Sequence, residues 1–198
     1  MAAAPVVSNA VGSEVERCPG GFEWVAGRGC TVIPEKDAPP DDRVELPPPD
    51  GTKRLRARDG ISEISIPDRW DEMTDLNDEA KLEAGNAVAE EYVIVLTEAK
   101  SDFATPIDLA RYADINLATM RTVVPGAQIS HPRSLTIDGR EAAQYEIRGV
   151  VDGLDIVYLA TYVAGRAHVH QVVMWSIASH FEAARADFER VAESFREL

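Results

Sequence analysis

His168 and His170 are the residues of this sequence whose types and spacing come nearest to a metal-binding or reactive site. They stand two positions apart in a segment typical of a β-strand, so both imidazoles lie on one face of a sheet. Such a pair can bind a metal ion if further ligands lie about 2.0–2.2 Å from it. The expected strand register instead places the backbones of Gln144 and His170 roughly 10 Å apart, with Glu146 further along. We therefore expect no metal, and a solvated or hydrogen-bonded histidine pair instead.

A polar edge surrounds these histidines on the same predicted face. The middle of that face is apolar, so its polar edge is the candidate for a ligand-binding cleft. The side chains that we expect to line this cleft are Gln144, Glu146, Thr161, His168 and His170.

The sequence contains no recognisable catalytic constellation. Ser130 precedes His131 and Ser176 lies near His180, but proximity in sequence does not make a catalytic triad. No Gly-x-Ser-x-Gly elbow occurs, and no Gly-rich turn is suited to a phosphate. We expect no catalytic residues, no cofactor and no enzymatic activity.

Cys18 and Cys30 are the two cysteines, and the segment between them is rich in glycine. A disulfide between them would close a small loop around Trp24, and the alternative is a pair of free thiols. Zinc is disfavoured here, because no third or fourth cysteine or histidine lies nearby. The expected disulfide favours an extracytoplasmic location, in the periplasm or at the cell surface. The N-terminus lacks the charged start and apolar core of an intact signal peptide, so an export signal would already have been removed.

Composition restricts the partners of the chain. Its 198 residues are 45% hydrophobic and carry a net charge of −14. An acidic chain repels phosphate backbones, which disfavours nucleic acid as a partner. No stretch approaches the ~20 consecutive apolar residues of a transmembrane helix. We expect a protein partner of unknown identity, and a monomer.

Composition also divides the chain into four parts. Residues 1–17 are expected to be disordered, residues 18–33 form the two-cysteine loop, and residues 34–59 form a Pro-rich acidic linker with a basic patch. The folded domain is expected over residues 60–198. The basic patch is interpreted as a charged strand edge, or alternatively as a contact for an anion or an acidic partner. It consists of Lys53, Arg54, Arg56 and Arg58. Arg140, Arg148 and Arg166, near strand ends, are interpreted as ordinary surface charge, or alternatively as contacts for an anionic ligand.

Periodicity predicts the elements of the folded domain. Strands are expected at residues 61–66, 82–86 and 91–97, where β-branched and aromatic residues are frequent. Thr105 as N-cap and Pro106 as first residue predict a helix that ends near Val124. Ser179 and Glu182 form a capping box for a last helix. The apolar stripe of that helix consists of Phe181, Ala184, Phe188, Val191, Phe195 and Leu198.

Two hairpin turns set the register of the remaining long strands. Asp152-Gly153 suits a two-residue turn that pairs Val151 with Leu154, and Gly165-Arg166 suggests a second turn that pairs Ala164 with Ala167. Both faces of the resulting sheet carry apolar residues, so both need cover. We therefore expect an α+β fold: a three-layer α/β/α sandwich with a central antiparallel sheet.

Several segments resemble the PsbP/Mog1-like family: residues 64–70 (Ile-Ser-Ile-Pro-Asp-Arg-Trp), 81–86, 91–103, 139–145 and 188–195. The resemblance covers roughly Gly60 to Leu198. It implies an antiparallel sheet between helices, without enzymatic activity. Members of that family bind or scaffold other proteins, and many bacterial relatives are exported.

Two functions remain open at this stage. The first is a non-catalytic binding or scaffold domain of the bacterial cell envelope. The alternative is a small-molecule or metal-binding protein that uses a cleft on one face of the sheet.

Overall fold

The computed structural model describes residues 22–25, 29–32 and 51–198. The chain divides into two units, residues 1–46 and 47–198. In the first unit, β1 (Phe22–Val25) and β2 (Gly29–Val32) form an antiparallel hairpin. Cys18 lies outside the described residues, so its disulfide with Cys30 stays a prediction. None of the helices in the described part of the chain is long and apolar enough to cross a lipid bilayer.

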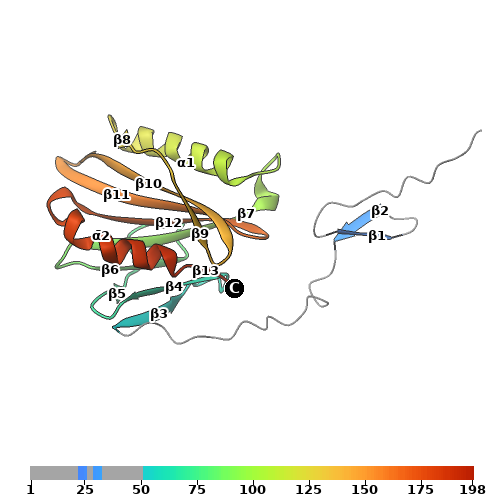
Figure 1. Cartoon of the computed structure of the whole chain (residues 1–198), viewed down its shortest axis with the longest axis horizontal. Coiled ribbons are helices and arrows are strands. Elements are labelled where there is room, and N and C mark those ends of the chain that lie inside the picture. The colour runs from blue at the N-terminus through green and yellow to red at the C-terminus, as the bar shows by residue number, and fades with distance from the viewer. Residues whose placement is uncertain (1–21, 26–28, 33–50) are drawn as a thin grey trace, which may run out of the picture. The chain divides into compact units, whose positions relative to one another are not determined.

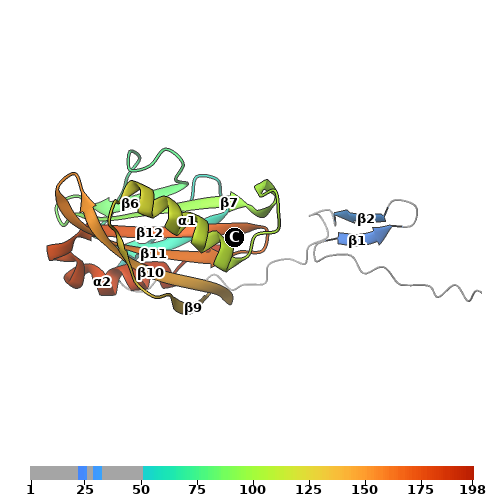
Figure 2. The same cartoon turned by 90° about the horizontal axis from the view of Figure 1, so that it is seen from above.

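The second unit is built on an antiparallel sheet with a helix on each face (Figures 1 and 2). In spatial order its strands are β5 (Asp71–Glu72), β6 (Leu82–Asn86), β7 (Glu91–Ala99), β12 (His168–Ile177), β11 (Leu154–Ala164), β10 (Arg140–Val151) and β8 (Gln128–Ile129), with β9 (Arg133–Ile137) also paired to β10. Helix α1 (Leu109–Val123) covers one face, and α2 (Ala178–Glu193) covers the other. A short 3-10 helix, η2 (Lys100–Asp102), follows β7.

A second, smaller sheet adjoins α2. It contains β13 (Arg196–Glu197), β4 (Ser62–Pro67) and β3 (Thr52–Arg56), in that spatial order. Ile64 and Ile66 of β4 are buried in the same core as α2. The three-layer α+β architecture is therefore confirmed, with this small sheet as an additional part of the layer that contains α2.

The first hairpin turn is confirmed, and the second is wrong by two residues. Asp152 and Gly153 have φ of 52° and 81°, as a two-residue turn requires, and Val151 pairs with Leu154. Ala164 pairs with Val169 rather than with Ala167. Gly165 does not adopt a positive φ, so the tight turn that we expected does not form. Because a shift of two residues preserves the side-chain alternation, the predicted faces remain correct.

The two faces contribute to two separate cores. On the α1 face, Tyr162, Val169 and Val173 pack with Tyr112 and Leu117 of the helix. On the α2 face, Leu159, Val172 and Met174 pack with Phe181 and Phe188, among others. Each strand thus contributes alternate residues to opposite layers, as the register predicted.

Helix α1 ends at Val123 with Val124 as C-cap, as predicted, but it begins later than predicted, and α2 begins and ends differently from the prediction. Asp108, not Thr105, caps α1: its backbone is extended and its carboxylate accepts a hydrogen bond from the Arg111 N–H at 2.8 Å. Ser179 does not cap α2, because the helix already begins at Ala178 and has no side-chain cap. The helix ends at Glu193, and the chain then extends into β13. Phe195 is still buried, whereas Leu198 is exposed.

The folded unit begins earlier than the expected boundary at Gly60, because β3 pairs with β4 along its whole length. The basic patch lies on and after β3, and its charges face carboxylates of the same unit. Arg54 and Arg56 lie 3.4 and 3.6 Å from Glu63, whose side chain is only 5% exposed, and Arg58 lies 3.0 Å from buried Glu83. These arginines therefore form ion pairs with buried carboxylates. A buried carboxylate is less destabilising to the fold when it is paired than when it is unpaired.

Candidate functional site

The five residues expected to line one cleft lie at three separate places on the α2 face. His168 and His170 lie next to Glu197. Gln144 and Thr161 form a buried pair, and Glu146 belongs to a group of surface charges. Gln144, Thr161 and His170 are buried. These side chains therefore do not line a common open cleft.

The pair of Gln144 and Thr161 is a satisfied polar contact beneath the surface. The Gln144 amide donates to the Thr161 hydroxyl at 3.0 Å, and its carbonyl oxygen accepts from Arg133 at 3.3 Å. Their backbones are partners across β10 and β11. Because buried polar groups are costly when unpaired, these bonds explain how two polar residues are tolerated in this layer.

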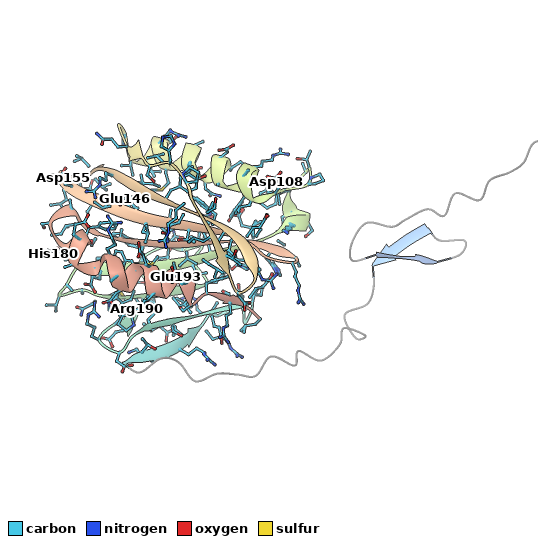
Figure 3. All side chains as sticks on the ribbon, in the orientation of Figure 1. Asp108, Glu146, Asp155, His180, Arg190 and Glu193 are labelled. Atoms are coloured by element: carbon cyan, nitrogen blue, oxygen red, sulfur yellow. The ribbon has the colours of Figure 1, made fainter. Side chains whose placement is uncertain are left out.

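Glu146 joins β10 to α2 through ion pairs (Figure 3 labels its position). Its carboxylate lies 2.7 Å from Arg185 and 2.6 Å from Arg148. Partial burial would raise the pKa of Glu146, but hydrogen bonds and charge attraction from Arg185 and Arg148 lower it overall. The Arg185 guanidinium also lies over the Phe181 ring, 4.7 Å from its centroid. All these cationic and anionic groups have partners within the domain.

Glu197 lies at the centre of the third group. Arg140 Nη2 and the backbone N–H of Arg166 approach its Oε2 at 2.9 and 2.8 Å. Its Oε1 lies 3.2 Å from His168 Nδ1 and 3.5 Å from His170 Nε2. Burial would raise the pKa of Glu197, but the adjacent His170 imidazole, the Arg166 N–H, Arg140 and His168 together lower it to about 2. Glu197 is therefore a carboxylate over the ordinary pH range.

Gly165 allows this carboxylate to approach the β11–β12 loop. A Cβ at position 165 would lie 2.6 Å from Glu197 Oε1 and 2.8 Å from the carbonyl oxygen of His168. Both neighbours are constrained, the first by Arg140 and the second by its backbone. The role of Gly165 is thus close approach and not the positive φ that sequence reasoning assigned to it.

An open groove, which we call the α1 groove, lies on the opposite face of the sheet. It has a volume of about 890 Å³ and is bounded by α1, the loop at residues 76–81, and β7, β12 and β11. Its apolar lining includes Ile94, Val173, Trp175, Tyr158 and Met120. The Trp175 ring stacks on Tyr92 at 5.4 Å and lies 6.2 Å from Tyr158 between centroids.

Polar and acidic side chains form the rim of the α1 groove. Asp78, Glu79 and Glu98 contribute carboxylates and Lys81 contributes one amine, so these lining charges are predominantly negative. Toward the helix, the Gln171 amide donates to Asn116 at 2.9 Å, which links β12 to α1. This arrangement combines an aromatic and aliphatic floor with an acidic edge.

The Glu98 carboxylate is additionally held by α1. It accepts a hydrogen bond from the Tyr112 hydroxyl at 2.7 Å. Burial and the adjacent Glu98 raise the pKa of Tyr112 far above its usual value, so this tyrosine remains a neutral donor. The acidic edge of the groove is thus partly fixed in position.

The serines that stand near histidines in the sequence donate their hydroxyls to backbone carbonyls. Ser130 Oγ donates to the carbonyl oxygen of His131 at 3.0 Å, and Ser176 Oγ donates to that of Ile177 at 3.3 Å. A nucleophilic serine requires a base that takes its proton. These hydroxyls instead donate to backbone carbonyls.

Sequence reasoning missed Glu197 and the loop at residues 76–81. Glu197 was placed within a helix, although Phe195, Arg196 and Glu197 alternate in burial as a strand does. The loop carries Asp78 and Glu79, to which the sequence assigned no role. No local pattern in either segment indicates which distant residues it would meet.

Neither a family model nor a curated protein matches the sequence at a significant level. Solved structures do match. The cyanobacterial PsbP protein CyanoP from Synechocystis is 18% identical, with a TM-score of 0.57 over 75% of this chain and 93% of that one. LpqN, involved in cell envelope biogenesis of Mycobacterium tuberculosis, is 13% identical, with a TM-score of 0.55 over 76% and 87%.

The Ran-binding protein Mog1p of Saccharomyces cerevisiae has the same fold at 10% identity, with a TM-score of 0.52 over 74% of this chain and 95% of that one. The described domain therefore has the PsbP/Mog1-like fold, which confirms the resemblance seen in the sequence. At these identities, the likeness establishes the fold alone.

Proposed function

We propose that this protein is a non-catalytic binding domain of the bacterial cell envelope, and that the α1 groove holds an apolar, basic segment of a partner protein. The observation that carries the proposal is the groove itself. An exposed concave surface with aromatic and aliphatic side chains on its floor is typical of a recognition site.

The rim determines the chemistry of the partner. Asp78, Glu79 and Glu98 outnumber Lys81 among the charged lining residues. A partner segment that places apolar side chains on Trp175 would therefore bind best with lysine or arginine beside them, because complementary charge favours correct docking.

Three features support a location in the cell envelope. LpqN, which shares the fold, is described as involved in cell envelope biogenesis. The two cysteines are expected to form a disulfide, which persists in oxidising compartments. The Pro-rich segment that precedes the domain suits an extended spacer.

Site-specific photo-crosslinking from α1 tests the proposal. Thr119 lines the groove, whereas Thr122 does not. Both threonines are exposed, and each hydroxyl donates to the carbonyl oxygen four residues earlier at 3.2 Å. They are therefore a matched pair on one helix. A photoreactive residue at 119, but not at 122, should crosslink one envelope protein in the cell of origin. An excess of unlabelled wild-type chain should compete for that protein and reduce the crosslinked product, whereas an excess of unlabelled Thr119→Arg chain should not.

Equal crosslinking from both positions, or none from position 119, would remove the groove as a protein-binding site. A small apolar molecule is the second candidate, because the groove volume falls within the range of roughly 300–1,000 Å³ that is usual for ligand pockets. A thermal-shift screen of apolar amines and lipids distinguishes it: a compound that raises Tm for Thr122→Arg but not for Thr119→Arg occupies the groove.

A further inference from the structure

A second site lies on the opposite face of the sheet from the α1 groove, where the end of the chain meets the start of β12. His168 and His170 of β12 and Glu197 of β13 direct their polar atoms toward one another. The two imidazole nitrogens and Glu197 Oε1 all lie within 4.8 Å of one another. The site shares no side chain with the floor of the groove, because β12 contributes alternate residues to the two faces.

Two groups hold the Glu197 carboxylate through its Oε2 oxygen. Arg140 and the Arg166 N–H lie against Oε2, at 2.9 and 2.8 Å. Oε1 lies beside the two histidines, 3.2 Å from His168 Nδ1 and 3.5 Å from His170 Nε2. In metal sites, hydrogen bonds to the atoms of a ligand residue that do not bind the metal commonly fix that residue in position before the metal binds.

His170 is oriented in the same manner. Its Nδ1 lies 3.1 Å from the Thr97 hydroxyl, within hydrogen-bonding distance. Its side chain is 0% exposed, and its Nε2 makes no hydrogen bond in the described part of the chain. Nε2 lies 3.5 Å from Glu197 Oε1. A buried imidazole nitrogen without a hydrogen bond, aimed at a carboxylate oxygen, is unfavourable unless something binds between them.

We propose that His168, His170 and Glu197 bind a divalent transition-metal ion of the Zn²⁺ type. Imidazole and carboxylate are ligands that Zn²⁺ favours. Ligand atoms about 2.05 Å from a tetrahedral Zn²⁺ are separated by roughly 3.3 Å, and Oε1 lies 3.2 and 3.5 Å from the two imidazole nitrogens. The His168 side chain is 24% exposed, so an ion, and a water as its fourth ligand, would enter beside His168.

The bound ion would join β13, the last strand, to the centre of the main sheet. The expectation of no metal considered only the strand neighbours Gln144 and Glu146. Glu197 supplies the third ligand from the C-terminal end of the chain. The inference is independent of the proposed partner groove, since it concerns the other face.

Binding of Zn²⁺ to the full-length chain tests the site. Cys18→Ser/Cys30→Ser is used as the background beside the wild type, so that thiolates do not contribute ligands. After treatment with a chelator, Zn²⁺ is titrated in competition with a chromophoric indicator, and Co²⁺ is added separately for absorption spectroscopy. We expect one ion per chain and the intense visible bands of four-coordinate Co²⁺.

Variants separate this site from adventitious binding. His168→Ala should reduce the affinity at least 100-fold, and, because His168 is half-buried at the surface, the domain should stay folded. Thr97→Val, which removes the hydroxyl that orients His170, should reduce the affinity about 10–100-fold. His131→Ala and His180→Ala are the matched controls, because both histidines are exposed and lie outside the cluster (His180 is labelled in Figure 3).

Two results would overturn the proposal. The first is the absence of Zn²⁺ binding to the full-length chain, which would leave the cluster as an ion-pair network only. The second is binding that His168→Ala leaves unchanged, or that His131→Ala or His180→Ala reduces equally. Circular dichroism of each variant confirms that a loss of binding does not reflect a loss of fold.

Discussion

Glu197→Gln removes a buried charge from the last strand while preserving the shape of the side chain. The Glu197 carboxylate is only 5% exposed and lies against Arg140, the Arg166 N–H and the two histidines. An amide cannot accept these bonds as a charged group does, and its NH₂ would face one of the donors. We therefore expect β13 to be held less firmly and the whole domain to be less stable.

The magnitude follows from the pKa of Glu197, which is lowered from 4.5 to about 2. At about 1.4 kcal/mol per tenfold change in acid strength, this corresponds to about 3 kcal/mol of stability at pH 7. Because the pKa is lower in the folded chain than in the unfolded chain, the contribution is fully present above pH 4.5. It is lost as the pH falls toward 2, and about 1 kcal/mol should remain at pH 3.

Urea unfolding followed by tryptophan fluorescence measures this difference, with a chelator present so that bound metal does not contribute. Glu141→Gln is the control, because Glu141 is exposed on β10, next to Arg140 in the sequence. We expect the wild type and Glu197→Gln to differ by about 3 kcal/mol at pH 7 and to converge as the pH falls. A difference below about 0.5 kcal/mol at pH 7, or one that persists unchanged at pH 3, would refute the reasoning.

Three further substitutions test the packing and the close contacts of the domain. Gly165→Ala places a Cβ 2.6 Å from Glu197 Oε1, so we expect a loss of about 1–3 kcal/mol by urea unfolding, together with weaker Zn²⁺ binding. Glu91→Leu removes the carboxylate that accepts from the Trp70 indole N–H at 2.7 Å; the unpaired buried donor should cost about 2–3 kcal/mol, and an unchanged Tm would contradict this. Phe188→Ala leaves a cavity at a fully buried position, and a loss of about 3–5 kcal/mol is expected in the same unfolding assay.

Much of the sheet could be predicted because its determinants are local. Asp152-Gly153 specifies a two-residue turn through the positive φ of both residues, and the turn sets the pairing of β10 with β11. Alternation then assigns every side chain of those strands to a face. The prediction failed at Gly165, where the reason for a glycine is the nearby Glu197 carboxylate and not the turn itself.

The helix boundaries show the same limit. Ser179 and Glu182 match a capping box, yet β12 runs directly into α2 and the helix begins two residues earlier than a Ser179 N-cap would place it. The spacing of Phe195 continues the helical stripe, yet the chain leaves the helix there to pair with β4. In both places a strand pairing overrides the local helical pattern, since backbone hydrogen bonds to a neighbouring strand replace those within the helix.

The sequence alone determined the class of fold and the two faces of the sheet. It also showed that the imidazoles of His168 and His170 share one face. Alternation, turn residues and apolar spacing act between residues that are close in the chain, so they can be read from it. Only the tertiary structure decided that Glu197, about thirty residues further on, joins those histidines, and that α1 and the loop at residues 76–81 border one groove. Such contacts depend on how the layers pack, and the residues next to each partner in the sequence do not specify which distant residue it will contact.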